Sequence, residues 1–81
     1  MQVTARFFAI LKDRAGVAEL ILELPAGATV TSAIELIVKQ FPAIQSDLKR
    51  AAFAVNRNYT NTDLVLSDGD ELALIPPVSG G

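Results

Sequence analysis

Cysteine, histidine and tryptophan are all absent from this sequence of 81 residues. The absence of cysteine excludes a disulfide framework and a thiolate nucleophile, and the absence of histidine excludes a histidine general base. Without these two residue types the chain also lacks the ligands of an ordinary zinc site. Few side chains remain that can carry out chemistry.

Charge and long apolar runs are sparse as well. The net charge is −2 and the basic residues form no stripe, so we expect no nucleic-acid partner. No apolar run approaches the ~18–20 residues of a membrane span, and the first residues carry no signal-peptide pattern. The sequence therefore predicts one cytoplasmic domain with no membrane partner, whose core needs neither metal nor disulfide because 51% of its residues are hydrophobic.

Alternating apolar and polar residues predict the strands. We expect strands over residues 2–11, 17–24, 52–55 and 71–75, with at most a short edge strand in residues 59–66. Residues 12–16 are predicted to be a polar turn between the first two strands. Two further turns are expected at residues 56–58 and 67–70, the second with Gly69 in the left-handed conformation.

The main helix is predicted to begin at one of several possible N-caps in residues 29–32 and to run to about residue 40. An apolar stripe runs at helical spacing from Val30 to Phe41, and Ser32 with Glu35 fits a capping box. Pro42 limits the helix, and residues 43–50 form a second, shorter helical segment. The fold class is therefore α+β, a mixed sheet with one main helix packed on one face. The first and last strands are apolar on both sides, which predicts that they are central, parallel neighbours in a β-grasp arrangement over residues 1–75.

Residues 76–81 are predicted to form an extended, flexible C-terminal tail. Pro76 and Pro77 lack backbone N–H groups, so they end the strand ladder and hold the chain extended. Gly80 and Gly81 have no Cβ and can enter a narrow channel. The tail can reach about 20 Å at ~3.3 Å per residue, so it can present a terminal carboxylate to another molecule.

That carboxylate is the one group we expect to react. It is ionised at neutral pH and is a poor electrophile, so it must first be activated, most simply as an acyl-adenylate made with ATP. The chain offers no phosphate-binding loop and no base, so a partner must supply the chemistry. The acidic residues Asp68, Asp70 and Glu71 lack the spacing of a calcium loop and are interpreted as a turn with solvated charge.

Five segments resemble the small, sulfur-carrying subunit of molybdopterin synthase, a ubiquitin-like β-grasp family. The most specific segment is Ile75-Pro76-Pro77-Val78-Ser79-Gly80-Gly81, and the others are residues 7–11, 24–30, 54–56 and 68–71. The resemblance implies that an enzyme of the ubiquitin-activating type adenylates Gly81 and that a sulfur donor protein converts it to a thiocarboxylate. It further implies that the large synthase subunit uses this sulfur to form the dithiolene of molybdopterin from cyclic pyranopterin monophosphate.

The resemblance also assigns roles along the tail. Gly81 is the reacting residue, and the residues expected to lie in the partners' channels are Pro77, Val78, Ser79 and Gly80. No cofactor is expected to bind the chain tightly, since ATP is used by the activating enzyme, and the chain is expected to be a non-catalytic subunit. From the strand pattern itself, Phe8 and Ile75 should lie near each other on the sheet face opposite the helix and contact the large subunit.

Other functions share parts of this pattern. A sulfur carrier for thiamine thiazole synthesis, or for another thiolation pathway, has the same fold and the same Gly-Gly end. A ubiquitin-like modifier would instead join Gly81 to a lysine amine. A plain interaction domain would have a tail that does not react.

Overall fold

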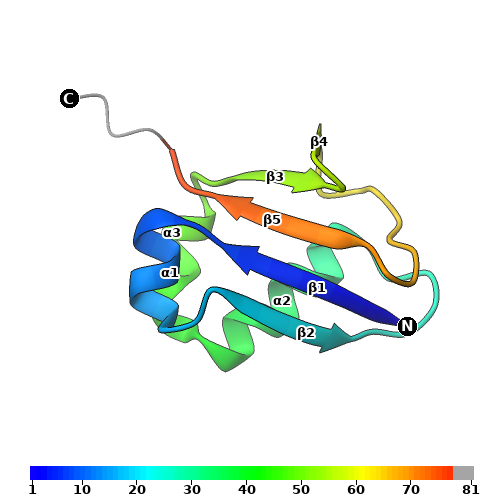
Figure 1. Cartoon of the computed structure of the whole chain (residues 1–81), viewed down its shortest axis with the longest axis horizontal. Coiled ribbons are helices and arrows are strands. Elements are labelled where there is room, and N and C mark those ends of the chain that lie inside the picture. Colours follow the sequence, from blue (N-terminus) through cyan, green and yellow to red (C-terminus); the bar gives the residue numbers. More distant parts are fainter. Residues whose placement is uncertain (78–81) are drawn as a thin grey trace.

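Five strands form one mixed sheet in the computed structural model, which describes residues 1–77 (Figure 1). The spatial order is β2-β1-β5-β3-β4, with β1 and β5 parallel and every other neighbouring pair antiparallel. The predicted central, parallel pairing of the first and last strands is confirmed. The strands are β1 (Gln2–Phe7), β2 (Glu19–Glu23), β3 (Ala52–Val55), β4 (Asn58–Thr60) and β5 (Glu71–Ile75).

The helices lie together on one side of this sheet (Figure 1). They are α1 (Ala9–Ala15), α2 (Val30–Gln40), the single 3₁₀ turn η1 (Pro42–Ile44) and α3 (Gln45–Leu48). This arrangement confirms the α+β, β-grasp prediction, with α2 as the main helix and η1–α3 as the short second segment. Within residues 1–77, no helix has both the length and the apolarity to cross a membrane.

The prediction for residues 8–16 was wrong, because β1 ends at Phe7, Phe8 is an N-cap, and residues 9–15 form α1. Ala9 has φ 51°, a left-handed conformation that turns the chain out of the sheet direction. Leu11 is then fully buried under the sheet. Gly16 ends the helix with φ 79° and donates its N–H to the Lys12 carbonyl at 2.9 Å. Besides the main helix and the short second segment, the chain therefore contains a third helical element, α1, that the sequence pattern did not predict.

Helix α2 ends at Gln40 as predicted, and its N-cap is the first of the candidates in residues 29–32, but the capping box is a different pair. Thr29 is the N-cap, and its side chain accepts a hydrogen bond from the Ser32 N–H at 3.3 Å. The Ser32 hydroxyl in turn accepts from the Thr29 N–H at 3.2 Å, so the capping box joins residues 29 and 32 and not 32 and 35. The predicted box was placed one turn too late, because Val30 already belongs to the helix and is fully buried.

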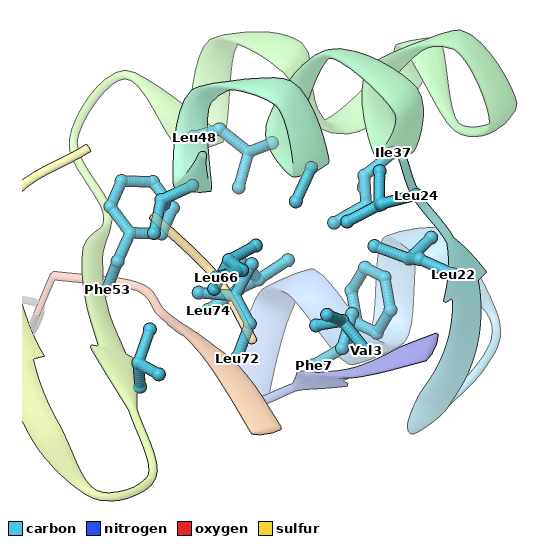
Figure 2. Close-up of a cluster of buried hydrophobic side chains, with 14 of the residues drawn as sticks. Val3, Phe7, Leu22, Leu24, Ile37, Leu48, Phe53, Leu66, Leu72 and Leu74 are labelled. Carbon is cyan, nitrogen blue, oxygen red and sulfur yellow. The ribbon is translucent and has the colours of Figure 1, made fainter. Parts of the chain in front are cut away.

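The core lies between the helices and one face of the sheet (Figure 2). Alternate residues of the two central strands point into it, and all five are at most 2% exposed: Val3, Ala5, Phe7, Leu72 and Leu74. From the helices, Leu11, Ile37 and Ile44 are fully buried against them. The Phe7 ring meets the Phe41 ring edge-on at 5.9 Å between centroids. Among residues 1–77, no polar or charged residue is buried.

Candidate functional site

No helix within residues 1–77 covers the second face of the sheet, and we call it the open face (Figure 1). Residue pairing places one row of Cα partners across all five strands: Glu19, Arg6, Ala73, Ala54 and Tyr59. Because strand side chains alternate, every member of this row points away from the core. The open face is therefore mixed in character, with charge on the β2 side and an aromatic ring on the β4 side.

A groove of about 780 Å³ lies on the open face, over β1, β5, β3 and β4. Ala54 and Ala73 are paired neighbours in β3 and β5 and form its floor. Ala54 is only 4% exposed although it lies outside the core cluster, as expected for the bottom of a hollow. Alanine is depleted in strands. Here the small side chains of two alanines leave a depression between the larger side chains around them. The floor can therefore accept an apolar side chain from outside.

Larger side chains form the two walls of the groove. Phe8 and Ile10, on the β1 side, are 41% and 42% exposed, and Tyr59, on the β4 side, is 75% exposed. Ile75, Pro76 and Pro77 line the end of the groove where the described chain stops. An exposed aromatic and aliphatic cluster of this kind is typical of a protein-binding surface.

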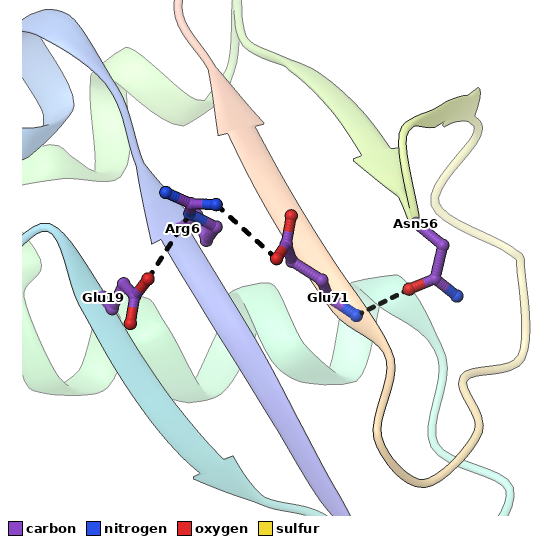
Figure 3. A network of polar contacts seen from close by, with 4 residues as sticks. All are labelled: Arg6, Glu19, Asn56 and Glu71. Carbon is purple, nitrogen blue, oxygen red and sulfur yellow. Dashed lines mark hydrogen bonds and ion pairs between the residues drawn. The ribbon is translucent and has the colours of Figure 1, made fainter.

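Arg6 is held in place beside the groove by two carboxylates (Figure 3). Its guanidinium lies 3.6 Å from Glu19 on β2 and 3.6 Å from Glu71 on β5. It also lies 5.8 Å from the centre of the Phe8 ring, a distance that allows a cation–π contact. The backbone N–H of Glu71 donates to the Asn56 side-chain oxygen at 3.0 Å, which connects this network to the β3–β4 turn. The charge of Arg6 is thus already balanced within the chain.

The structure brings the two predicted interface residues together. Phe8 and Ile75 both line the groove, as does Pro77 from the predicted channel-binding set. Phe8 reaches this position because its extended backbone, followed by the left-handed Ala9, forms the corner between β1 and α1. Val78, Ser79, Gly80 and Gly81 lie outside the described residues, so their assigned roles stay predictions.

Sequence reasoning missed most of the groove. The alanine floor and the flanking residues Ile10, Arg57 and Tyr59 were not predicted as parts of a site. A signal was available, because Ala73 and Ala54 occupy outward positions of strands whose neighbours are large. The turn interpretation of the acidic cluster holds for two of its three residues: Asp68 accepts from the Gln2 N–H at 2.7 Å, and Asp70 accepts from the Ser67 N–H at 2.7 Å. Glu71 instead begins β5 and forms an ion pair with Arg6.

The fold and the open face define a protein of the ubiquitin-like β-grasp class. SAMP1 from Haloferax volcanii has the same fold, with a TM-score of 0.93 and 29% identity over the full length of both chains. A solved complex of subunits 1 and 2 of the molybdopterin-converting factor from Helicobacter pylori contains a similar chain, with a TM-score of 0.73 and 27% identity, again over the full length of both.

Within this class the chain belongs to the ThiS family, whose sequence model matches residues 5–81. The molybdopterin synthase sulfur carrier subunit of Chlamydomonas reinhardtii is 40% identical over 83 residues that span all of both chains. The corresponding subunit of Arabidopsis thaliana is 32% identical over all of this chain and 84% of its own length. The family resemblance predicted from the sequence is confirmed.

Proposed function

We propose that this chain is the sulfur-carrying subunit of a molybdopterin synthase. The observation that carries the proposal is the continuity of the groove with the start of the tail. Ile75, Pro76 and Pro77 line one end of the groove, so a protein docked there lies beside the point where the tail begins. The names of the relatives and the complex of the Helicobacter pylori subunits support the large synthase subunit as that protein.

The reaction begins at the carboxylate of Gly81. An enzyme of the ubiquitin-activating type uses ATP to form the acyl-adenylate, with pyrophosphate as the leaving group. The terminal sulfur of a persulfide on the sulfur donor protein then attacks the acyl carbon and AMP leaves, which gives an acyl disulfide. A thiol of the donor protein cleaves this disulfide, so the thiocarboxylate is released and the donor is left with a disulfide. The large subunit accepts the tail and uses the sulfur to form the dithiolene of molybdopterin from cyclic pyranopterin monophosphate. This chain is the sulfur donor in the cytoplasm and binds no cofactor tightly; its partners carry out the catalysis.

The groove supplies the docking half of this function. Phe8 and Ile75 are partly exposed apolar side chains on a rigid sheet, and the alanine floor between the strands can accept an anchor from the large subunit. Because the fold already fixes the backbone at both positions, docking has to order only side chains, and its entropic cost is smaller than for a disordered segment. The tail then needs only to pass into the active site of the partner, where Gly80 adds no side-chain bulk.

A second function is favoured by one observation, the likeness to SAMP1. That protein is described as a small archaeal modifier protein, and its TM-score of 0.93 exceeds the 0.73 of the Helicobacter pylori subunit. A modifier would use the same adenylate but transfer Gly81 to a lysine amine. The two functions diverge only at the nucleophile that displaces AMP.

Intact-mass spectrometry separates these functions. The full chain is incubated with ATP, its activating enzyme and a sulfur donor, and we expect a mass increase equal to the difference between sulfur and oxygen. A ladder of conjugates on other proteins would favour the modifier. The control lacks Gly81: it should show no mass change and keep the same melting temperature, because the core ends with β5. An unchanged mass for the complete chain, with all components active, would contradict the proposal.

A further inference from the structure

The β3–β4 turn holds an arginine in a conformation that suits glycine. Val55 pairs with Asn58, so Asn56 and Arg57 form a two-residue hairpin turn with φ 50° and 71°. Such turns strongly favour Asn-Gly, because both residues need positive φ and glycine accepts it without steric cost. Asparagine fits the first position, but arginine at the second is strained. Strained residues are retained mainly where the surroundings or a function require them.

Arg57 also differs from the other arginine of the groove in its charge environment. Arg6 is balanced by Glu19 and Glu71, each at 3.6 Å. The ion pairs formed within residues 1–77 do not include Arg57, which is exposed and lines the groove beside Tyr59 and the floor residue Ala54. The carboxylate that also lines the groove, Glu71, is paired with Arg6. Within residues 1–77, the groove therefore presents an apolar floor and, at its β4 end, an arginine that forms no ion pair.

We propose that Arg57 selects the partner by binding a carboxylate next to the apolar residue that fills the groove. The expected element of the large subunit is a bulky apolar side chain over Ala54 and Ala73, followed by an aspartate or glutamate that reaches Arg57. Arginine suits this role because its planar guanidinium can bind a carboxylate through two parallel hydrogen bonds. This inference rests on the proposed function, since it requires the large subunit to dock on the open face.

The apolar floor and the charge give the groove two separate recognition elements. The floor favours any apolar side chain of suitable size, whereas Arg57 discriminates among partners by charge. The adenylating enzyme and the large subunit both have to bind the C-terminal tail. A residue beside the groove can therefore determine which of these two proteins binds this chain more tightly. An exposed arginine on a turn needs no special explanation by itself. What sets Arg57 apart is the combination of backbone strain, the lack of an ion pair among residues 1–77 and its position in the groove.

The charge is tested by calorimetric titration of the full chain with its large subunit. We expect Arg57→Glu to weaken binding about tenfold or more, because like charges then meet, and the loss should shrink at high salt. Arg57→Gly should weaken binding about fivefold yet melt at the same or a higher temperature, since glycine relieves the strained turn. The matched control is Arg50→Glu, an exposed arginine that does not line the groove, which should bind within about twofold of the parent.

The apolar floor is tested in the same way. Ala73→Leu fills the floor and should weaken binding about tenfold with little change in melting temperature. Thr4→Leu is the control, because Thr4 lies on the same face of the neighbouring strand and outside the groove. If Arg57→Glu binds like the parent while Phe8→Asp binds more weakly, the role of Arg57 is refuted and docking on the open face stands. If Phe8→Asp and Ile75→Asp also bind like the parent, the docking part of the proposed function fails.

Discussion

The two faces of the sheet are made by the same strands but have opposite composition. On the helix face, Leu72 and Leu74 are fully buried and belong to one apolar cluster. On the open face, the alternate residues of the same strand, Glu71, Ala73 and Ile75, line the groove. Because successive side chains of a strand point to opposite sides, five residues of β5 serve both purposes at once. Stability and recognition can therefore be altered separately in this protein.

The two faces also differ in their content of charged side chains. The core cluster contains only apolar side chains, whereas Arg6, Glu19 and Glu71 form a partly exposed network on the open side (Figure 3). Burying unpaired charge is costly, and at a solvated face the same groups gain little from pairing. The helix face should thus dominate the free energy of unfolding, and the open face should dominate the free energy of binding.

The largest expected effect comes from opening a cavity on the helix face. Ile37→Ala removes a fully buried side chain of α2 and should lower the free energy of unfolding by about 2–5 kcal/mol. The matched variant is Ile21→Ala, whose side chain is 64% exposed on the open face and should cost no more than about 0.5 kcal/mol. Urea titration of both variants measures the difference. Equal losses in the free energy of unfolding would show that the helix face does not contribute more to stability than the open face.

The division between the faces was largely predictable from the sequence, and the corner between β1 and α1 was not. Apolar–polar alternation identified four strands, and helical periodicity identified α2. The run Phe7-Phe8-Ala9-Ile10-Leu11 is apolar throughout and has no period, so the hydrophobic pattern of this run does not mark the break after Phe7. The break depends on Ala9 in the left-handed conformation. From a sequence alone, this conformation is expected at glycine or asparagine and not at alanine. Leu11 and Ala15 at helical spacing, followed by Gly16, were the available indication.

The candidate site was predicted only in part, for a related reason. Phe8 and Ile75 are large and apolar at outward positions, so the sequence predicted them as neighbours. The groove between them is defined by small residues on strands far apart in sequence, Ala54 and Ala73, which become significant only when β3 pairs with β5. The role of Arg57 could not be predicted from the sequence either, because its backbone strain and its lack of an ion-pair partner within residues 1–77 are properties of the folded turn.

The second prediction concerns Gly80, which belongs to neither face. Gly80→Val should slow thiocarboxylate formation about 100-fold, or about 2.7 kcal/mol, because a displacement of about 1 Å at the reacting carbon has this effect. Gly80→Ala should slow it less, since alanine adds less bulk and is not β-branched. Both should melt like the parent. The rates are measured as intact mass against time. Equal rates for the parent, Gly80→Ala and Gly80→Val would mean that no narrow channel of a partner selects for glycine at this position.

A smaller effect is expected when charge is placed in the groove. Phe8→Asp or Ile75→Asp should weaken binding to the large subunit by more than about 1 kcal/mol while the melting temperature changes little. Ile21→Asp is the control, because Ile21 is on the same face but outside the groove. Calorimetry gives the affinities. Weakening by Ile21→Asp to the same extent would indicate a general charge effect and not a defined docking surface.

The smallest effect should come from removing the charge of Arg6. Arg6→Met keeps the apolar stem and removes both ion pairs, which are 3.6 Å long and join side chains that are 40–58% exposed. Pairs of this kind contribute about 0–1 kcal/mol, because solvent screens them and long side chains lose entropy when they are held. The free energy of unfolding should fall by no more than about 1 kcal/mol, and the difference should decrease further in 1 M salt, where charges are screened within about 3 Å. A loss as large as that of Ile37→Ala, unaffected by salt, would mean that the open face contributes to folding through this network. The distinction between a stabilising face and a recognition face would then have to be withdrawn.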